Sequence, residues 1–367
     1  MVIENVNLKR QYKSIKSEID DAIYSVVQSQ HFSLGPALAD FEIQFADYIG
    51  SKYVVGVDNG SDALIFTLLA LGIGKGDEVI TPVNSFTSTT FAITEVGATP
   101  VFVDVNRDTH QISVEAVKSK ITSNTKCILP VHLYGSPCEI DKIKSITDQH
   151  GIALVEDAAQ AHGSYLHGKH LGTYGKMGVF SFYPGKNLGA YGNGGAICTD
   201  DEKLYHKLRL LRNFGQEERY FHKEFGYNSK LDDIQAAVLT VKLHHLNEWN
   251  SKRRSIAKLY DAALTNIVKP RILDGALPNR HLYVIESDSR NKLLAHLNKK
   301  GIQALIHYPL NIHLQECYKH LGHKVGDFPN AEDISNRVLS LPIYAELKKT
   351  EVAFICAEVE AFNHESV

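Results

Sequence analysis

The sequence predicts an α/β protein built on a mostly parallel sheet with helices on both faces. Seven short runs rich in β-branched or aromatic residues recur between residues 54 and 198, and several are apolar throughout, as strands buried on both faces are. Helical segments separate some of these runs, and strand–helix–strand repetition is typical of a parallel sheet. A chain of 367 residues is long enough for two or three domains, or for one large α/β domain with a smaller unit attached.

The predicted elements follow from local patterns along the first half of the chain. The seven strands are expected at 54–57, 79–81, 101–103, 128–131, 153–156, 179–181 and 196–198. A helix over 62–71 stops at Gly72, and a second helix over 139–150 stops at Gly151. Glycine is the residue that most often follows the end of a helix, so both boundaries have a physical basis.

After residue 200 the pattern changes to that of a smaller α+β unit. Residues 231–249 have the apolar spacing of a long helix, and the Pro- and Gly-containing segment 268–279 reads as a connector. A strand at 281–286, a helix at 290–299 and a strand from 301 to 307 follow. We therefore predict a large α/β domain at residues 1–245 and a small C-terminal α+β domain at 246–367, with the long helix bridging them.

Composition excludes several functional classes. Lysine and arginine number 39 and aspartate and glutamate 42, which gives a formal net charge of −3. Dedicated nucleic-acid binders usually carry a basic excess. The five cysteines form no C-x-x-C pair, which favours a reduced, cytoplasmic chain without structural zinc. No apolar run approaches the roughly 20 residues that span a bilayer, and the N-terminus lacks the apolar core of a signal peptide. We expect no nucleic-acid or membrane partner.

Candidate ligand-binding residues stand at the carboxyl ends of the predicted strands, where parallel α/β sheets bind ligands. Gly60 and Ser61 open a helix directly after the first strand, and free N–H groups at a helix N-terminus bind anions. Ser61 would serve equally well as an ordinary helix cap. Asp157 ends the fifth strand, where its carboxylate could meet a protonated ring nitrogen or a metal, or could simply cap a helix.

The segment around Lys186 carries the strongest signal for chemistry. Five glycines fall between Gly185 and Gly195, and Lys186 stands between a strand end and this glycine-rich stretch. Glycines allow close approach of backbone and ligand, and a lysine in such a pocket can lose its proton and form a Schiff base. A solvated surface lysine is the alternative. The segment has neither the G-x-x-x-x-G-K-[ST] of a phosphate-binding loop nor a dinucleotide-binding fingerprint.

A lysine, an upstream acid, an anion site and an aromatic residue at a strand end, Phe86, together suit pyridoxal 5′-phosphate (PLP). The sequence Ser-Phe-Tyr-Pro-Gly-Lys-Asn-Leu-Gly-Ala at 181–190 resembles that of the sugar aminotransferases of the DegT/DnrJ/StrS group, which have the aspartate-aminotransferase (type I PLP) fold. The resemblance runs from Phe32 to Tyr344. It implies that the seven-stranded sheet belongs to a PLP-binding domain.

The resemblance also implies a role for each matching residue at the cofactor ring. Lys186 corresponds to the lysine that holds PLP and then moves the proton during amino transfer. Asp157 corresponds to the acid that pairs with the pyridine nitrogen. Gln160 corresponds to the residue near the phenolic oxygen, and Phe86 to the aromatic residue that stacks on the ring.

Further matching residues correspond to phosphate contacts. Gly60, Ser61 and Ser181 match positions that bind the cofactor phosphate within one subunit. Asn228 matches an asparagine that family members contribute to the phosphate site of the partner subunit. The resemblance therefore implies a homodimer with shared active sites.

The sequence around Lys186 is most similar to that of the branch that aminates C-3 of dTDP-3-keto-6-deoxyhexoses. Tyr183, His307 and, less clearly, His313 match positions near the hexose, although packing or surface roles are common for histidines. The expected reaction moves an amino group from L-glutamate, released as 2-oxoglutarate, to the dTDP-sugar, for surface polysaccharide or glycosylated metabolites. The alternatives are amination at C-4 or of a UDP-N-acetyl sugar, and a non-catalytic relative that binds PLP or a nucleotide sugar.

The sequence departs from the family pattern at one notable position. Asn193 stands where the Gly-x-Gly-Gly motif normally carries Asp or Glu, which removes a charge near the cofactor lysine. This change concerns pH behaviour and rate rather than the class of reaction. Milder departures are Ser61, Ser136, Gly185 and Lys230.

Overall fold

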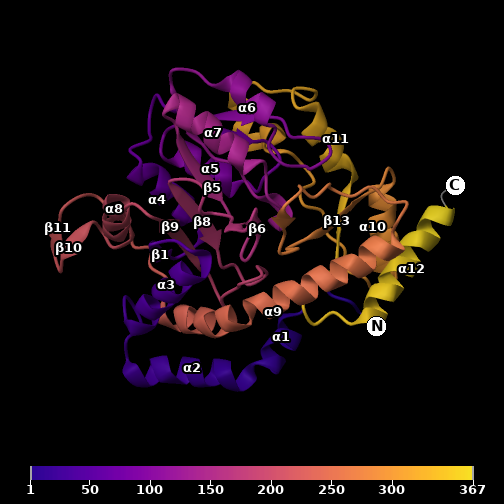
Figure 1. The fold of residues 1–367 in the computed structure, drawn as a ribbon, viewed down its shortest axis with the longest axis horizontal. Coiled ribbons are helices and arrows are strands. Elements are labelled where there is room, and N and C mark those ends of the chain that lie inside the picture. The colour runs from indigo at the N-terminus through magenta and orange to yellow at the C-terminus, as the bar shows by residue number, and fades with distance from the viewer. Residues whose placement is uncertain (1, 366–367) are drawn as a thin grey trace.

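Twelve α-helices and fourteen β-strands follow one another along residues 2–365, the part of the chain that the computed structural model describes (Figure 1). The helices are α1 (Leu8–Ser14), α2 (Lys16–Ser29), α3 (Pro36–Ile49), α4 (Gly60–Ala70), α5 (Ser88–Glu95), α6 (Val114–Lys120), α7 (Ile140–His150), α8 (Glu202–Arg212), α9 (Asp233–Ala263), α10 (Arg290–Lys299), α11 (Pro329–Arg337) and α12 (Lys349–Glu365). The strands are β1 (Tyr53–Val57), β2 (Glu78–Pro82), β3 (Thr99–Val103), β4 (Thr125–Ile128), β5 (Ala153–Asp157), β6 (Tyr165–Leu166), β7 (Lys169–His170), β8 (Met177–Ser181), β9 (Gly195–Thr199), β10 (Gln216–Glu218), β11 (Phe221–His222), β12 (Ala276–Leu277), β13 (Tyr283–Glu286) and β14 (Val338–Leu341).

The central sheet has seven strands in the order β1-β9-β8-β5-β4-β2-β3. Strands β8, β5, β4, β2 and β3 pair in parallel, while β9 runs antiparallel to both β8 and β1. The predicted α/β class with a seven-stranded sheet is therefore confirmed, and six of the seven predicted strands fall inside observed strands. All the parallel strands present their carboxyl ends at one edge of the sheet, where a ligand site is expected.

Helices cover both faces of the sheet, and neighbouring residues of one strand are therefore buried in different hydrophobic clusters. Val54 and Val55, neighbours in β1, belong to separate hydrophobic clusters because side chains alternate along a strand. The first cluster contains residues of α3, α6, α7 and α9, and the second contains residues of α4, α5 and α8. Burial on both faces is why these strands read as continuously apolar in the sequence.

Two predicted strands differ from the structure. Strand β4 ends at Ile128, whereas the sequence predicted a strand over 128–131; Pro130 has no N–H to donate to a neighbouring strand. The predicted strand from 301 to 307 is also wrong. That segment makes only isolated bridges, one from Ile302 to Ile3 and one from Leu305 to Ser340, so it has no continuous partner strand.

Helix α9 is longer than the predicted helix over 231–249. It continues to Ala263 because its second half carries Ile256, Ala257 and Tyr260 into another hydrophobic core, formed mainly with β13, β14, α10 and α12. Figure 1 shows α9 running from beneath the sheet towards α12. The proposed division at residue 245 falls inside this helix. No helix within residues 2–365, α9 included, is long and apolar enough to cross a membrane.

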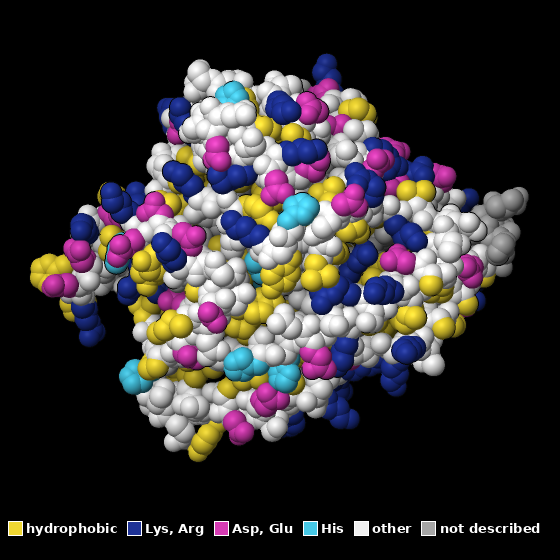
Figure 2. Space-filling model, viewed as in Figure 1, with side chains coloured by type: hydrophobic (Ala, Val, Ile, Leu, Met, Phe, Trp, Pro, Cys, Tyr) yellow, Lys and Arg dark blue, Asp and Glu magenta, His cyan; other side chains and the backbone are white. Residues whose placement is uncertain are grey.

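A hairpin formed by β10 and β11 projects from the body of the molecule, at the left of Figure 1. Aromatic residues on and next to it are exposed, with Phe225 99%, Tyr220 75% and Phe221 71% accessible. Figure 2 shows hydrophobic side chains at the tip of this projection. The hairpin therefore presents an exposed aromatic surface.

Candidate active site

Lys186 lies between the carboxyl end of β8 and the glycine-rich segment that leads to β9. Its backbone N–H donates to the carbonyl oxygen of Tyr183 at 2.8 Å. Burial lowers the pKa of the half-buried Lys186 amine to about 8, while the negative charge of Asp157 acts in the opposite direction. A lysine with that pKa is about a tenth neutral at pH 7, far more than an ordinary lysine, so it is suited to nucleophilic attack.

Asp157 lies at the end of β5, which is the neighbour of β8 in the sheet. Its Oδ2 accepts a hydrogen bond from Thr89 Oγ1 at 2.9 Å, and its Oδ1 accepts one from the backbone N–H of Ala159 at 3.1 Å. Burial raises the pKa of this carboxyl group; the two hydrogen bonds and Lys186 oppose that rise. A buried carboxylate held in this way would gain from pairing with a protonated nitrogen of a ligand.

Gln160 and Phe86 share a neighbour, Tyr308. Gln160 Oε1 accepts from the backbone N–H of Tyr134 at 2.6 Å, and its Nε2 donates to the hydroxyl of Tyr308 at 3.3 Å. The ring of Tyr308 lies 5.8 Å from that of Phe86, centroid to centroid. Sequence reasoning missed Tyr308, although it sits in the Ile-His-Tyr-Pro motif that pointed to His307. Phe86 is 56% exposed and therefore accessible to a ligand.

The structure brings Gly60, Ser61 and Ser181 together as a small cradle. Ser61 Oγ donates to Ser88 Oγ, at the start of α5, at 2.7 Å. A Cβ atom on Gly60 would lie 2.8 Å from the Cβ of Ser181, so only glycine leaves this space open. Asn59 caps α4 by accepting from the backbone N–H of Asp62 at 2.8 Å. The cradle thus combines hydroxyl groups with the positive end of α4, which suits a phosphate group.

The three predicted sugar-binding residues occupy different environments. Tyr183 is 63% exposed. His307 shares a hydrogen bond of 2.9 Å with Ser340 Oγ; burial, with a contribution from the positive charge of Lys186, lowers its pKa to about 4. His313 lies instead in a hydrophobic cluster, where its ring packs on Phe328 and its Nε2 lies 3.1 Å from Glu332 Oε1. With its side chain fully buried, His313 is not accessible to a substrate in this conformation.

Asn228 lies at the base of the projecting hairpin, where it is exposed and accepts a hydrogen bond from Lys230 Nζ. The following residue, Ser229, is fixed to α4, because its hydroxyl donates to Asp62 Oδ2 at 2.5 Å. Asn193, the main departure from the family pattern, is also exposed.

Two further buried histidines, His162 and His281, lie near enough to Lys186 for its charge to affect their pKa values, and they were not predicted. The pKa of each ring is held well below its usual value, by burial first and then by the positive charge of Lys186. His162 lies five residues after Asp157 in the same loop, so its position in the sequence offered a signal. His281 comes from the segment before β13, and no local pattern connects it with Lys186.

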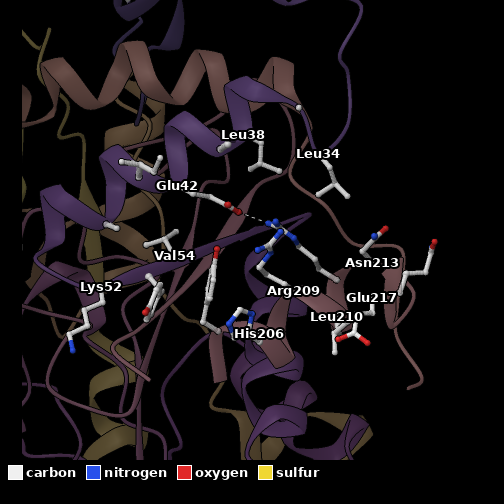
Figure 3. Close-up of a pocket in the computed structure, with 18 of the residues that line it drawn as sticks. Leu34, Leu38, Glu42, Lys52, Val54, His206, Arg209, Leu210, Asn213 and Glu217 are labelled. Carbon is white, nitrogen blue, oxygen red and sulfur yellow. Dashed lines mark hydrogen bonds and ion pairs between the residues drawn. The ribbon is translucent and has the colours of Figure 1, made fainter. Parts of the chain in front are cut away.

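A groove of about 900 Å³ lies elsewhere, between α3, β1 and α8 (Figure 3). In the close-up Glu42 extends from its helix into the groove, where it pairs with Arg212. The side chains of Leu34 and Ile43 are exposed at its edge. The groove also reaches Asn213, which forms a bridge with Asn228, so it adjoins the base of the hairpin.

Comparison with known proteins identifies relatives over almost the whole chain. Residues 13–360 match the model of the DegT/DnrJ/EryC1/StrS aminotransferase family. The chain is 42% identical to a dTDP-3-amino-3,4,6-trideoxy-alpha-D-glucose transaminase from Streptomyces venezuelae, over 94% of this chain and 92% of the relative. It is 37% identical to a UDP-N-acetyl-3-dehydro-alpha-D-glucosamine 3-aminotransferase from Acidithiobacillus ferrooxidans, over 99% of this chain and 98% of the relative.

A solved structure agrees with these relationships. The crystal structure of S. venezuelae DesV in complex with a ketimine intermediate superimposes with a TM-score of 0.97 at 40% identity, covering 98% of both chains. Other solved relatives carry the cofactor as PLP or pyridoxamine phosphate. Fold and site thus define a PLP-dependent sugar aminotransferase. The chain belongs to the DegT/DnrJ/EryC1/StrS aminotransferase family.

The residues present fit the cofactor. The cradle at Gly60 would be filled by any larger side chain, Asp157 is a buried carboxylate, and Lys186 carries an amine of lowered pKa. Bound PLP supplies an electron sink that makes the Cα proton of an amino donor acidic.

Proposed function

We propose that this enzyme transfers the amino group of L-glutamate to the C-3 keto group of a dTDP-3-keto-6-deoxyhexose. The products are 2-oxoglutarate and a dTDP-3-amino-3,6-dideoxyhexose. The observation that supports this substrate class most directly is the Ser181–Ala190 motif around Lys186, together with the similarity to a transaminase whose name includes a dTDP-3-amino sugar. His307, close to Lys186, and the exposed Tyr183 provide groups for sugar hydroxyls.

In this proposal each residue of the site has a defined task. Lys186 would hold the cofactor through Nζ; once the amino donor has taken its place there, the freed Nζ amine would take the Cα proton from the donor and return a proton on the other side of the transfer. Asp157 keeps the ring nitrogen protonated, aided by its fixed hydrogen bond to Thr89. Phe86 would stack on the ring, and Gln160 would lie near the phenolic oxygen.

The phosphate is held by Gly60, Ser61 and Ser181 of one subunit and by Asn228 of a second copy. The exposed aromatic residues of the adjoining hairpin support this arrangement, since a surface of that kind is stabilised by burial against another chain. The proposed unit is therefore a homodimer with shared active sites. Sedimentation analysis of the wild type and of a variant lacking residues 216–224 tests it; a monomeric wild type would contradict it.

The test of activity separates the half-reactions. The purified holoenzyme is mixed with L-glutamate alone, and 2-oxoglutarate is measured; the expected yield is one equivalent per subunit. A sugar substrate is then added and the product is analysed by NMR, with dTDP-3-keto, dTDP-4-keto and UDP-N-acetyl-3-keto sugars in parallel. The proposal requires turnover of the dTDP-3-keto sugar and none for Lys186→Ala. Turnover of the dTDP-4-keto sugar alone would refute the C-3 assignment.

A UDP-N-acetyl-3-keto sugar is the second candidate substrate. It is favoured by the 37% identity to the A. ferrooxidans enzyme, which covers 99% of this chain. The same NMR experiment distinguishes it, because the two sugars differ in their nucleotide and at C-2. Preference for the UDP sugar by more than about tenfold in kcat/KM would replace the dTDP assignment.

A further inference from the structure

Three buried asparagine side chains connect the segment of Lys186 with the loop that carries Asp157. They are Asn187, Asn250 and Asn279, with exposures of 3%, 1% and 0%. They come from three distant parts of the chain, and none of them is required by the proposed chemical steps. Buried amides of this kind are costly unless every polar atom is satisfied, so their contacts define what they do.

Asn187, which follows Lys186 directly, is held from both ends of its amide. Its Nδ2 donates to Asn250 Oδ1 at 2.8 Å and to the carbonyl oxygen of Asn279 at 3.2 Å. Its Oδ1 lies 3.1 Å from His281 Nδ1. Because an amide oxygen only accepts, the His281 ring carries its proton on Nδ1 and donates. The residue beside Lys186 is therefore fixed on several sides at once.

The other two asparagines reach the loop that follows Asp157. Asn250 Nδ2 donates to the carbonyl oxygen of His162 at 2.9 Å. Asn279 Nδ2 donates to the carbonyl oxygens of Gln160 at 2.9 Å and of His162 at 3.0 Å. Asn250 thus binds both Asn187 and this loop through its side-chain amide, whereas Asn279 binds Asn187 through its main-chain carbonyl and the loop through its side chain.

At two positions the backbone passes so close to these amides that only glycine fits. A Cβ on Gly135 would lie 1.9 Å from Asn279 Oδ1, and one on Gly163 would lie 2.5 Å from Asn250 Nδ2. Both glycines also have positive φ angles, of 81° and 72°. Close backbone approach at two separate points indicates a site shaped around the amide groups rather than polar groups buried by chance.

We propose that Asn250 and Asn279 are positioning residues that set the place of the Lys186 amine relative to Asp157. The inference rests on the proposed role of Lys186. The two asparagines act through Asn187 and the main chain of the loop, so they touch neither cofactor nor substrate. Loss of one amide displaces Lys186, and displacements of about 1 Å cost up to about 100-fold in rate.

The test compares Asn250→Ala with Asn247→Ala. Asn247 lies on the same helix, is exposed, and accepts a hydrogen bond from Tyr48 outside this network, so it is a matched control. Two quantities are measured. The first is the rate of the glutamate half-reaction as a function of glutamate concentration. The second is the pKa of Lys186 in the cofactor-free protein, from the pH dependence of its acylation followed by mass spectrometry.

For Asn250→Ala we expect the half-reaction rate to fall about 10- to 100-fold, with the KM for glutamate unchanged within about twofold. The pKa of Lys186 should rise from about 8 towards its ordinary value, because a displaced amine is more exposed to water, which stabilises its charged form. Asn247→Ala should match the wild type in both the half-reaction rate and the pKa of Lys186. A folded Asn250→Ala protein with wild-type rate and wild-type Lys186 pKa would overturn the proposal.

Two further variants keep the test decisive. Should Asn250→Ala fail to fold, Asn187→Ala removes both N–H donors and the acceptor for His281 without adding a charge, and the same two changes are expected. In the double variant Asn187→Ala/Asn250→Ala the rate should fall by less than the product of the two single effects, because each single change already removes the shared Asn187–Asn250 hydrogen bond; fully multiplied effects would contradict the mechanism.

Failure of the proposed function would look different from failure of this inference. PLP must protect Lys186 of the wild type from acylation if Lys186 binds the cofactor. Unprotected Lys186 in the wild type would contradict the proposed function. Protected Lys186 with no effect of Asn250→Ala would contradict only the positioning role.

Discussion

Lys242 is a fully buried lysine on α9, and replacing it with methionine should change how stability depends on pH. Its Nζ donates to the carbonyl oxygen of Gly189 at 2.6 Å and lies 4.0 Å from the ring centroid of Tyr191. Burial lowers its pKa from 10.5 to about 7, opposed by the negative charge of Glu346. Methionine has a similar length but no charge, so Lys242→Met removes the titration and largely preserves the packing.

The sign and size of the effect follow from linkage between proton binding and folding. Between pH 7 and 10.5 the unfolded chain holds a proton on this lysine that the folded protein has lost, so stability rises with pH in that window. With pKa values of 10.5 and about 7, the wild type gains about 2.5 kcal/mol relative to Lys242→Met between pH 6 and pH 9. Loss of the hydrogen bond to Gly189 adds a cost of about 1–3 kcal/mol that does not depend on pH.

Urea unfolding of the cofactor-free proteins at several pH values measures this difference. The single tryptophan, Trp249, is buried on the same helix and reports unfolding by fluorescence. Titration of Lys186 occurs in both proteins and cancels in the comparison. Lys258→Met, at an exposed position of α9, is the control and should show no pH-dependent difference. A difference between wild type and Lys242→Met that stays constant within about 0.5 kcal/mol from pH 6 to 9 would refute the reasoning.

Three other predictions concern the site and its support. Gly60→Ala should weaken PLP binding about tenfold or more, because its Cβ would lie 2.8 Å from that of Ser181; an absorbance titration measures this. Asp157→Asn should lower the pKa of Lys186 further below about 8, because the negative charge of Asp157 raises that pKa. The pH dependence of Lys186 acylation measures it, and an unchanged pKa would contradict the prediction. Glu286→Gln should destabilise the protein by about 3–5 kcal/mol in urea unfolding, because this buried carboxylate pairs with two arginines and a histidine; a loss below about 1 kcal/mol would contradict it.

Much of the sheet was predictable because burial on both faces leaves a local mark. Strand β5, for example, has four of its five residues buried, and its apolar residues 153–155 stand directly before Glu156 and Asp157. The end of α9 was not predictable in the same way. Its first half packs against the sheet and its second half packs in another core, so a single apolar stripe does not continue through both. The apolar pattern in the sequence stops at Trp249. The helix itself continues, because only the elements that it packs against change there.

Within the site, residues in recognisable strand-end or glycine-rich motifs were predictable, and residues that only the fold joins to those motifs were not. Lys186 and the glycines after it are neighbours in the chain. Asn279 contacts Gln160 across 119 residues of sequence, and Asn250 contacts His162 across 88. Asparagine is common at helix caps and turns, so two buried asparagines far from the motif carry no pattern of their own. Only the folded chain shows that their amides converge.

One stripe of α9 holds the segment after Lys186 in place. Gln235 Oε1 accepts from the backbone N–H of Tyr191 at 2.8 Å, Lys242 donates to a carbonyl oxygen, and Asn250 binds the amide of Asn187. Steps of seven and eight residues correspond to about two helical turns each, so these side chains share one face. The same helix supports both hydrophobic cores. The position of Lys186 is therefore tied to the element on which the two parts of the molecule depend, which explains how a glycine-rich segment can hold a reactive lysine in a defined place.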